Sequence, residues 1–125
     1  MRLIRQPTDY TCGQSCIAMI SGTPIGEVRK ITKSGWNKRH WFGEKTSTSD
    51  LVRALRVLGI RSRRKLRRKI EGTSLPKTCI AKLCITGVRW GHWVVVHENR
   101  ILDPYYGINP CWPKGTHITS YLEIL

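Results

Sequence analysis

Apolar side chains in the first part of the chain recur at the three- and four-residue intervals that are typical of helices. One helix is predicted over residues 12 to about 20, with Thr11 as its N-cap and Ser21-Gly22 at its end. Thr23-Pro24 has the form of an N-cap followed by proline at the first helical position, which predicts a second helix to about residue 31. We therefore expect two short helices before residue 35.

A third helix is predicted in the middle of the chain. Its apolar face consists of Leu51, Leu55 and Leu58. Thr48 or Ser49 is the expected N-cap, and Gly59 is the expected end. Residues 36–49 have neither a helical nor a strand period and contain several aromatic side chains, so they are predicted to form a long surface loop before this helix.

Four segments in the second half of the chain are rich in β-branched and aromatic residues or alternate in polarity, and Gly, Pro or Asn separates them. They cover residues 78–85, 90–97, 100–102 and 117–125. Because the helices come first and the strands follow, we predict an α+β domain with a mostly antiparallel sheet, and not a parallel βαβ fold.

Length and composition indicate one globular domain. In a chain of 125 residues, a second core would leave neither half with enough buried surface. Apolar residues make up 40% and charged residues 24%, which excludes a wholly disordered or collagenous chain. No apolar stretch approaches the roughly 18–20 residues that a membrane span needs, and the basic N-terminal segment lacks the apolar core of a signal peptide. We therefore expect a cytoplasmic domain without a membrane span.

The chain is strongly basic. Lys and Arg total 22 against 8 Asp and Glu, a formal net charge of +14, which favours polyanionic partners. Much of this charge lies in one basic segment, residues 61–69, whose cationic members are Arg61, Arg63, Arg64, Lys65, Arg67, Arg68 and Lys69. We expect the basic segment to meet either an acidic protein or nucleic acid. It contains no aromatic residue for base stacking, although contacts with phosphates need none.

The cysteines do not have the spacing of a metal site. There are five, an odd number that leaves at least one thiol unpaired, and a reducing cytosol would keep all of them as thiols. The pairs Cys12/Cys16 and Cys79/Cys84 are spaced by four and five residues, whereas zinc sites favour Cys-x-x-Cys pairs or Cys/His clusters. We therefore expect neither a metal ion nor another cofactor.

Cys12 has a setting that favours a reactive thiolate. It follows a turn-like segment and stands at the predicted start of a helix, where free backbone N–H groups and the helix dipole stabilise an anion. Gln6, six residues upstream, carries an amide NH₂ that would stabilise an oxyanion together with the Cys12 backbone N–H. Cys16, one helical turn further along, is expected to point into the core.

A thiolate nucleophile needs a base, and His92 is the best placed of the four histidines. It lies in the strand before a turn predicted at Glu98-Asn99, and Asp103 lies in the returning strand. With the turn centred there, His92 is opposite Tyr105, and Asp103 is its diagonal neighbour on the same face, roughly 7–8 Å away. We predict that Asp103 orients the imidazole and that Cys12, His92 and Asp103 act as nucleophile, base and orienting group.

These residues lie in stretches that resemble a known family. The stretches are QPTDYTCGQSCIAMI at residues 6–20, GHWVVV at residues 91–96 and ILDP at residues 101–104. They are similar in order and spacing to the papain-like cysteine peptidases that process bacteriocin leaders after a double glycine, and to their stand-alone relatives. The resemblance extends more loosely to residues 50–60 and 75–83, and so covers most of the chain.

The resemblance implies a compact papain-like fold, with N-terminal helices packed on a C-terminal sheet, and the activity of a cysteine peptidase or a related amide or isopeptide hydrolase. It also implies roles for four residues: Gln6 in the oxyanion hole, Cys12 as nucleophile, His92 as base and Asp103 as the orienting group.

Substrate identity does not carry over from the family, because the sequence contains neither the membrane domain nor the ATPase of the transporter-linked members. We expect a polypeptide substrate from an acidic or nucleic-acid-associated protein, met in the cytoplasm of a bacterium or of a phage-infected host. Trp36, Trp41 and Trp93 are candidates to line the substrate groove.

A second hypothesis stays open. A non-catalytic papain-like module would bind nucleic acid or a protein assembly through the basic segment, for example as a bacteriophage structural component in the virion. The two hypotheses differ in what Cys12→Ala does, because only the enzyme needs the thiol.

Overall fold

The computed structural model describes residues 1–33, 46–63, 67–69, 72, 74–85, 91–109 and 115–125. Within these residues the chain forms three helices and a six-stranded sheet, which agrees with the predicted α+β organisation. The helices are α1 (Cys12–Ser21), α2 (Ile25–Lys33) and α3 (Thr48–Val57). The strands are β1 (Arg67–Arg68), β2 (Thr78–Ile85), β3 (Gly91–His97), β4 (Arg100–Asp103), β5 (Gly107–Asn109) and β6 (Thr116–Glu123).

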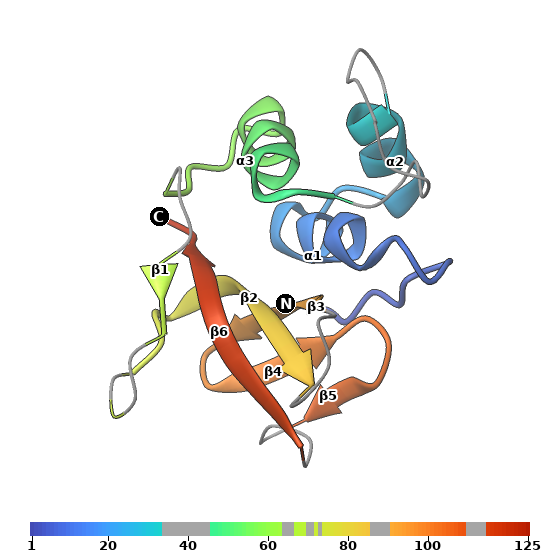
Figure 1. Cartoon of the computed structure of the whole chain (residues 1–125). Helices are drawn as coiled ribbons and strands as arrows, with labels where there is room; N and C mark the ends of the chain where they lie inside the picture. The colour runs from blue at the N-terminus through green and yellow to red at the C-terminus, as the bar shows by residue number, and fades with distance from the viewer. Residues whose placement is uncertain (34–45, 64–66, 70–71, 73, 86–90, 110–114) are drawn as a thin grey trace.

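The sheet is antiparallel throughout, with the strand order β1-β6-β2-β3-β4-β5. The three helices lie together on one side of it (Figure 1). Helix α1 packs against β3, and α2 and α3 pack against α1. Because α1 has neighbours on both sides, its residues from Gly13 to Met19 are all buried.

The start of α3 differs from the sequence prediction. Ser47 is the N-cap, and not Thr48 or Ser49, so the helix begins inside the segment predicted as loop. The Ser47 hydroxyl accepts a hydrogen bond from the Asp50 backbone N–H, and the Asp50 carboxylate accepts one from the Ser47 N–H. This reciprocal capping box selects Ser47 among three adjacent hydroxyl residues. The predicted end is confirmed, since Gly59 has a positive φ of 78° directly after the helix.

The four predicted strands are present with ends shifted by at most two residues, and two short strands were missed. Strand β1, two residues of the basic segment, pairs with β6, and β5 pairs with β4. Neither has enough residues to show a period of two in the sequence. Each is a strand only because a longer strand offers it a hydrogen-bonding edge.

Two apolar clusters hold the layers together. The larger lies between the helices and the sheet and includes Trp93 and Val95 of β3, while Val94 and Val96 belong to a smaller cluster of sheet residues. Successive β3 side chains therefore alternate between the clusters, and the strand is buried on both faces. No helix in the described ranges is long and apolar enough to cross a membrane.

Candidate active site

A hydrogen-bonded turn positions Cys12 at the start of α1. The Thr11 hydroxyl accepts a hydrogen bond from the Thr8 backbone N–H at 3.0 Å and donates one to the Thr8 carbonyl at 3.0 Å. Thr11 is fully buried, so this turn is enclosed by the protein. The chain enters the helix in a fixed direction, with Cys12 as the first helical residue.

The Thr11 side chain does not cap the helix that it precedes. Thr11 occupies the N-cap position predicted from the sequence, but it makes no side-chain cap hydrogen bond, because its hydroxyl is engaged by Thr8. An N-cap side chain normally takes the N–H of the second or third helical residue. Here the N–H groups of the first turn are left for another acceptor, beside the Cys12 sulfur.

Gln6 belongs to the same assembly. Its side-chain amide donates to the Thr8 carbonyl at 2.9 Å, and its backbone N–H donates to the Pro104 carbonyl at 3.1 Å. The second bond ties Gln6 to Pro104, the residue that directly follows Asp103 at the end of β4. An amide NH₂ has two hydrogens, so the bond to Thr8 leaves one for a ligand. These contacts join Gln6 to the turn that precedes Cys12 and to the residue that follows Asp103.

The β3–β4 hairpin brings His92 and Asp103 together. The turn consists of Glu98 and Asn99, both at positive φ (50° and 66°), as a two-residue type I′ turn requires. Pairing of His97 with Arg100 follows, and the register continues to Val95 opposite Leu102. Continued to the end of the hairpin, this register makes Asp103 the diagonal neighbour of His92, as the sequence predicted. The His92 Nε2 atom lies 2.6 Å from Asp103 Oδ1.

Backbone N–H groups hold the Asp103 carboxylate in place. The Oδ1 atom accepts hydrogen bonds from the N–H of Tyr105 at 2.8 Å and of Tyr106 at 3.2 Å. Sequence reasoning missed these two donors. The signal was the Asp-Pro-x-x-Gly pattern at residues 103–107, because aspartate at the first position of a turn commonly accepts bonds from the N–H groups that follow.

His92 links Asp103 to Cys12. The imidazole is 7% exposed, lies 2.6 Å from Asp103, and is near enough to Cys12 for the thiol to contribute to its pKa. Since Nε2 faces Asp103, Nδ1 is the ring nitrogen left for the sulfur. Burial disfavours the imidazolium, but the hydrogen bonds and charges of Asp103 and Cys12 outweigh it and raise the pKa of His92 to about 9.

The Asp103 pKa moves in the opposite direction. Burial alone would raise it, since the residue is 1% exposed, but the hydrogen bond and charge of His92 and the two tyrosine N–H groups lower the pKa below its usual value. At neutral pH the pair is therefore an imidazolium and a carboxylate. A protonated imidazole beside a thiol is the arrangement that stabilises a thiolate.

The other described cysteines lack this environment. Cys16 is fully buried as predicted, and burial raises the pKa of its thiol well above the usual value. Burial likewise raises the pKa of Cys79 to about 12. Cys84 is half-buried, and its sulfur lies 3.6 Å from the Thr119 hydroxyl. Of these four cysteines, Cys12 is the one that contributes to the raised pKa of His92.

Of the three tryptophans proposed for a substrate groove, only Trp93 is within the described residues, and Trp36 and Trp41 lie outside them. Trp93 is 8% exposed and packs in the larger apolar cluster. Its indole N–H donates to the Thr46 carbonyl at 3.3 Å. These are the contacts of a core residue that supports β3 beside His92.

Thr46 also closes over the start of α1. A Cβ atom at Gly13 would lie 1.9 Å from the Thr46 Oγ1 atom and 3.2 Å from a methyl carbon of Leu51. Gly13, the residue after the nucleophile candidate, is therefore required to be glycine by the packing of the segment that leads into α3. The sequence alone gave no sign of this contact, because it joins residues more than thirty positions apart.

The basic segment lies apart from the triad, along β6. Arg67 and Arg68 form β1 and are exposed, and the Arg63 side chain forms an ion pair with Glu123 at 3.3 Å. Arg61 is exposed, and the Lys69 N–H donates to the Thr119 carbonyl. Arg64 and Lys65 lie outside the described residues.

Comparison with known proteins does not name a family: no family model matches the chain, and no curated protein matches it.

Proposed function

We propose that this chain is a cysteine peptidase, or a related amide or isopeptide hydrolase, with a papain-like fold. The observation that carries the proposal is the buried His92–Asp103 pair, 2.6 Å apart, next to Cys12 at the start of α1. The three side chains have the chemistry of the nucleophile, base and orienting group of a catalytic triad, and the raised pKa of His92 keeps its imidazole protonated at neutral pH. The helices packed on an antiparallel sheet are compatible with the papain-like architecture.

In the first half of the reaction the Cys12 thiolate attacks the carbonyl carbon of the substrate. A carbon–sulfur bond forms, and the electron pair of the carbonyl moves onto its oxygen. When this tetrahedral intermediate collapses, the carbon–nitrogen bond breaks, and His92 gives the proton on Nδ1 to the leaving amine. The product of this half is an acyl-enzyme thioester.

The developing oxyanion needs hydrogen-bond donors, and we assign this role to two. One is the backbone N–H of Cys12, which, as the first residue of α1, has no acceptor within the helix. The other is the second N–H of the Gln6 amide, whose first is held by Thr8. Donors of this kind, fixed before the charge appears, each contribute about 3 kcal/mol to catalysis in well-studied hydrolases.

Hydrolysis of the thioester completes the cycle. Neutral His92 now takes a proton from water, and the resulting hydroxide attacks the acyl carbon. The carbon–sulfur bond breaks, which releases the carboxylic acid and restores the thiolate beside the imidazolium. Throughout, Asp103 stays ionised and keeps Nε2 occupied, so that Nδ1 always faces the sulfur.

The proposed substrate is a polypeptide, from an acidic or nucleic-acid-associated protein, and the proposed setting is the cytoplasm of a bacterium or of a phage-infected cell. The basis for the partner is the net charge of +14 and its concentration in the basic segment.

Thiol labelling tests the proposal. An alkyne derivative of iodoacetamide, at limiting concentration and pH 7, is expected to label Cys12 in the wild-type protein. His92→Ala should abolish the preferential labelling of this site, and Cys12→Ala should remove the labelled site itself. Cys84→Ala is the matched control, because Cys84 is also half-buried but has no part in the triad. Labelling of Cys84 in preference to Cys12 would contradict the assignment.

Turnover is tested separately. Wild-type protein and Cys12→Ala are incubated with a library of unfolded proteins, and new amino termini are identified by mass spectrometry. Termini produced only by the wild type support the hydrolase. Rapid labelling of Cys12 without any new termini would instead favour the non-catalytic module.

A further inference from the structure

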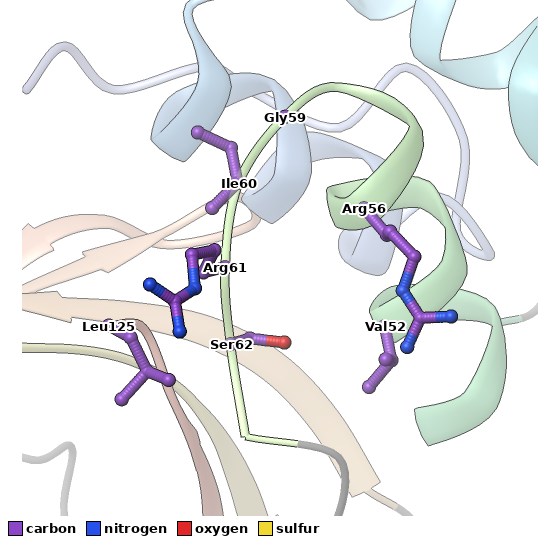
Figure 2. A pocket seen from close by; sticks show the side chains of 7 residues that line it. All are labelled: Val52, Arg56, Gly59, Ile60, Arg61, Ser62 and Leu125. Atoms are coloured by element: carbon purple, nitrogen blue, oxygen red, sulfur yellow. The ribbon is translucent and has the colours of Figure 1, made fainter.

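A groove lies between α3 and the end of β6, away from the triad. Its hollow has a volume of about 330 Å³ and is lined by Val52 and Arg56 of α3, by residues 59–62 and by Leu125. Figure 2 shows Arg56 projecting from the helix and Arg61 from the segment that follows it, while the Ser62 hydroxyl points toward α3. We name this hollow the arginine groove.

The arginine groove carries two positive charges that no described residue neutralises. Within the described ranges, the side chains of Arg56 and Arg61 form no ion pair and no hydrogen bond. The neighbouring Arg63, by contrast, is paired with Glu123. Figure 2 shows the two guanidinium groups on opposite sides of the 59–62 segment, where each can attract a carboxylate or phosphate and bind it through paired N–H groups.

A second hollow continues the groove toward β2. It has a volume of about 600 Å³ and shares Gly59, Ile60, Arg61 and Leu125 with the first. Its remaining walls include Lys77, which pairs with the exposed Glu98, and Glu123, which pairs with Arg63. Lys77 and Glu123 are thus each neutralised by their partners, and the positive charge of the continuous groove comes from Arg56 and Arg61.

The groove also has apolar walls, which help to distinguish an acidic peptide from a nucleic acid as its ligand. Val52 and Ile60 are half-buried and Leu125 is 59% exposed, so a ligand in the groove would cover apolar surface. The residues that line the two hollows include no Phe, Tyr or Trp, and the one imidazole among them, His97, contacts Glu98 and Thr78. Aliphatic walls with two arginines suit a peptide that carries both carboxylates and aliphatic side chains.

The groove and the triad lie at opposite ends of the sheet. Cys79 pairs with Glu123 on one side and with Val96 on the other, so the groove is level with the last residues of β3. His92 is near the first residue of that strand. At about 3.3 Å per residue, the four to five residues between these levels span roughly 15 Å. A ligand in the groove therefore leaves the sulfur open.

We propose that the arginine groove binds an acidic peptide segment, with its carboxylates on Arg56 and Arg61 and its aliphatic side chains on Val52, Ile60 and Leu125. The binding does not depend on catalysis. If the segment belongs to a substrate, the groove holds it at a distance from the bond to be cleaved and so favours acidic proteins as substrates.

Fluorescence anisotropy tests this proposal directly. A short labelled peptide rich in Asp and Glu, with interspersed Leu, is titrated with full-length Cys12→Ala protein, which binds without cleaving. Arg56→Glu and Arg61→Glu are each expected to weaken binding about tenfold or more. Lys30→Glu in α2 is the matched control: it makes the same charge change at an exposed site, and should alter the affinity less than about twofold.

Two further ligands decide the class of partner. A peptide of equal charge with Ser in place of Leu is expected to bind about fivefold to tenfold more weakly, because it covers no aliphatic surface. The affinity for a single-stranded oligonucleotide of equal charge is expected to be unchanged by Arg56→Glu.

Tighter binding of the oligonucleotide than of the peptide, lost in both arginine variants, would overturn the proposal in favour of nucleic acid. Equal loss in Lys30→Glu, or no binding of the peptide at low salt, would overturn it as well. Because no step needs the thiol, an inactive triad would leave these results unchanged.

Discussion

His92 Nε2 lies 2.6 Å from Asp103 Oδ1, and both side chains are almost fully buried. An ion pair out of water is costly unless its remaining atoms are also hydrogen-bonded. The two tyrosine N–H groups supply such bonds to Oδ1, while Oδ2 is buried without a hydrogen-bond partner among the described residues, and the net effect raises the pKa of His92 to about 9. The pair therefore keeps His92 charged at neutral pH, and this charge should be visible in both stability and reactivity.

Stability should fall as pH rises from 6.5 to 8. The folded pKa of His92, about 9, exceeds its unfolded value of about 6.5, so the protonated imidazole stabilises the fold fully below pH 6.5 and progressively less up to pH 9. Over 1.5 pH units the expected loss is about 2 kcal/mol in the free energy of unfolding. Urea denaturation at a series of pH values measures it.

Two variants show whether His92 is the cause. Asp103→Asn removes the charge that raises the His92 pKa, so the loss between pH 6.5 and 8 should shrink to less than half. Asp9→Asn, at an exposed position, should keep the wild-type pH dependence. A steep loss of stability in Asp103→Asn would show that another group titrates. Below pH 8 the buried thiols of Cys16 and Cys79 do not contribute, because their raised folded pKa values matter only where the unfolded thiols ionise.

Asp103→Asn should also slow the alkylation of Cys12 by iodoacetamide at pH 7, by about tenfold or more. The asparagine carbonyl still accepts from Tyr105 and Tyr106, so the turn is kept, but the imidazole loses the carboxylate and becomes largely neutral. Mass spectrometry of the modified peptides gives the rate. Cys84 serves as an internal standard, and its rate should not change. An unchanged rate at Cys12 would show that Asp103 does not act on the thiol through His92.

The His92–Asp103 relationship was predictable because local chemistry fixes it. A two-residue turn sets the hairpin register, and Asn99 tolerates the positive φ that the turn needs. The register then determines which residues are diagonal neighbours. Other features depend on partners that are distant in sequence, so no local pattern predicts them. These are the strand β1, the strand β5 and the packing of Thr46 on Gly13.

The sequence contains the residues that fix the start of α3, but the prediction assigned the wrong N-cap. Ser47, Thr48 and Ser49 are all good N-caps, and only the distance to Asp50 separates them. Ser47→Ala should therefore destabilise the protein by about 1 kcal/mol, since it breaks the capping box. Ser49→Ala should change stability by less than about 0.5 kcal/mol. Thermal unfolding of both variants makes the comparison, and a larger loss in Ser49→Ala would place the cap where the sequence first suggested.

Gly13→Ala should destabilise the protein by roughly 1–3 kcal/mol, although alanine is the better helix former. The new methyl group would collide with the Thr46 hydroxyl and would also lie only 3.2 Å from a methyl carbon of Leu51, so Thr46 would have to shift. Gly26→Ala in α2 is the matched control, because a Cβ there meets nothing within 4 Å. That substitution should be neutral or stabilise the protein by up to about 1 kcal/mol.

The pair of glycine variants also tests whether Thr46 reaches the active site. Displacing Thr46 removes the acceptor of the Trp93 indole N–H, and Trp93 adjoins His92 in β3. Gly13→Ala should therefore slow the alkylation of Cys12 as well as lower the stability, and Gly13→Ala/Thr46→Ala should recover part of both. If Gly13→Ala raised stability as Gly26→Ala does, Thr46 would not lie over α1, and the glycine after Cys12 would need another explanation.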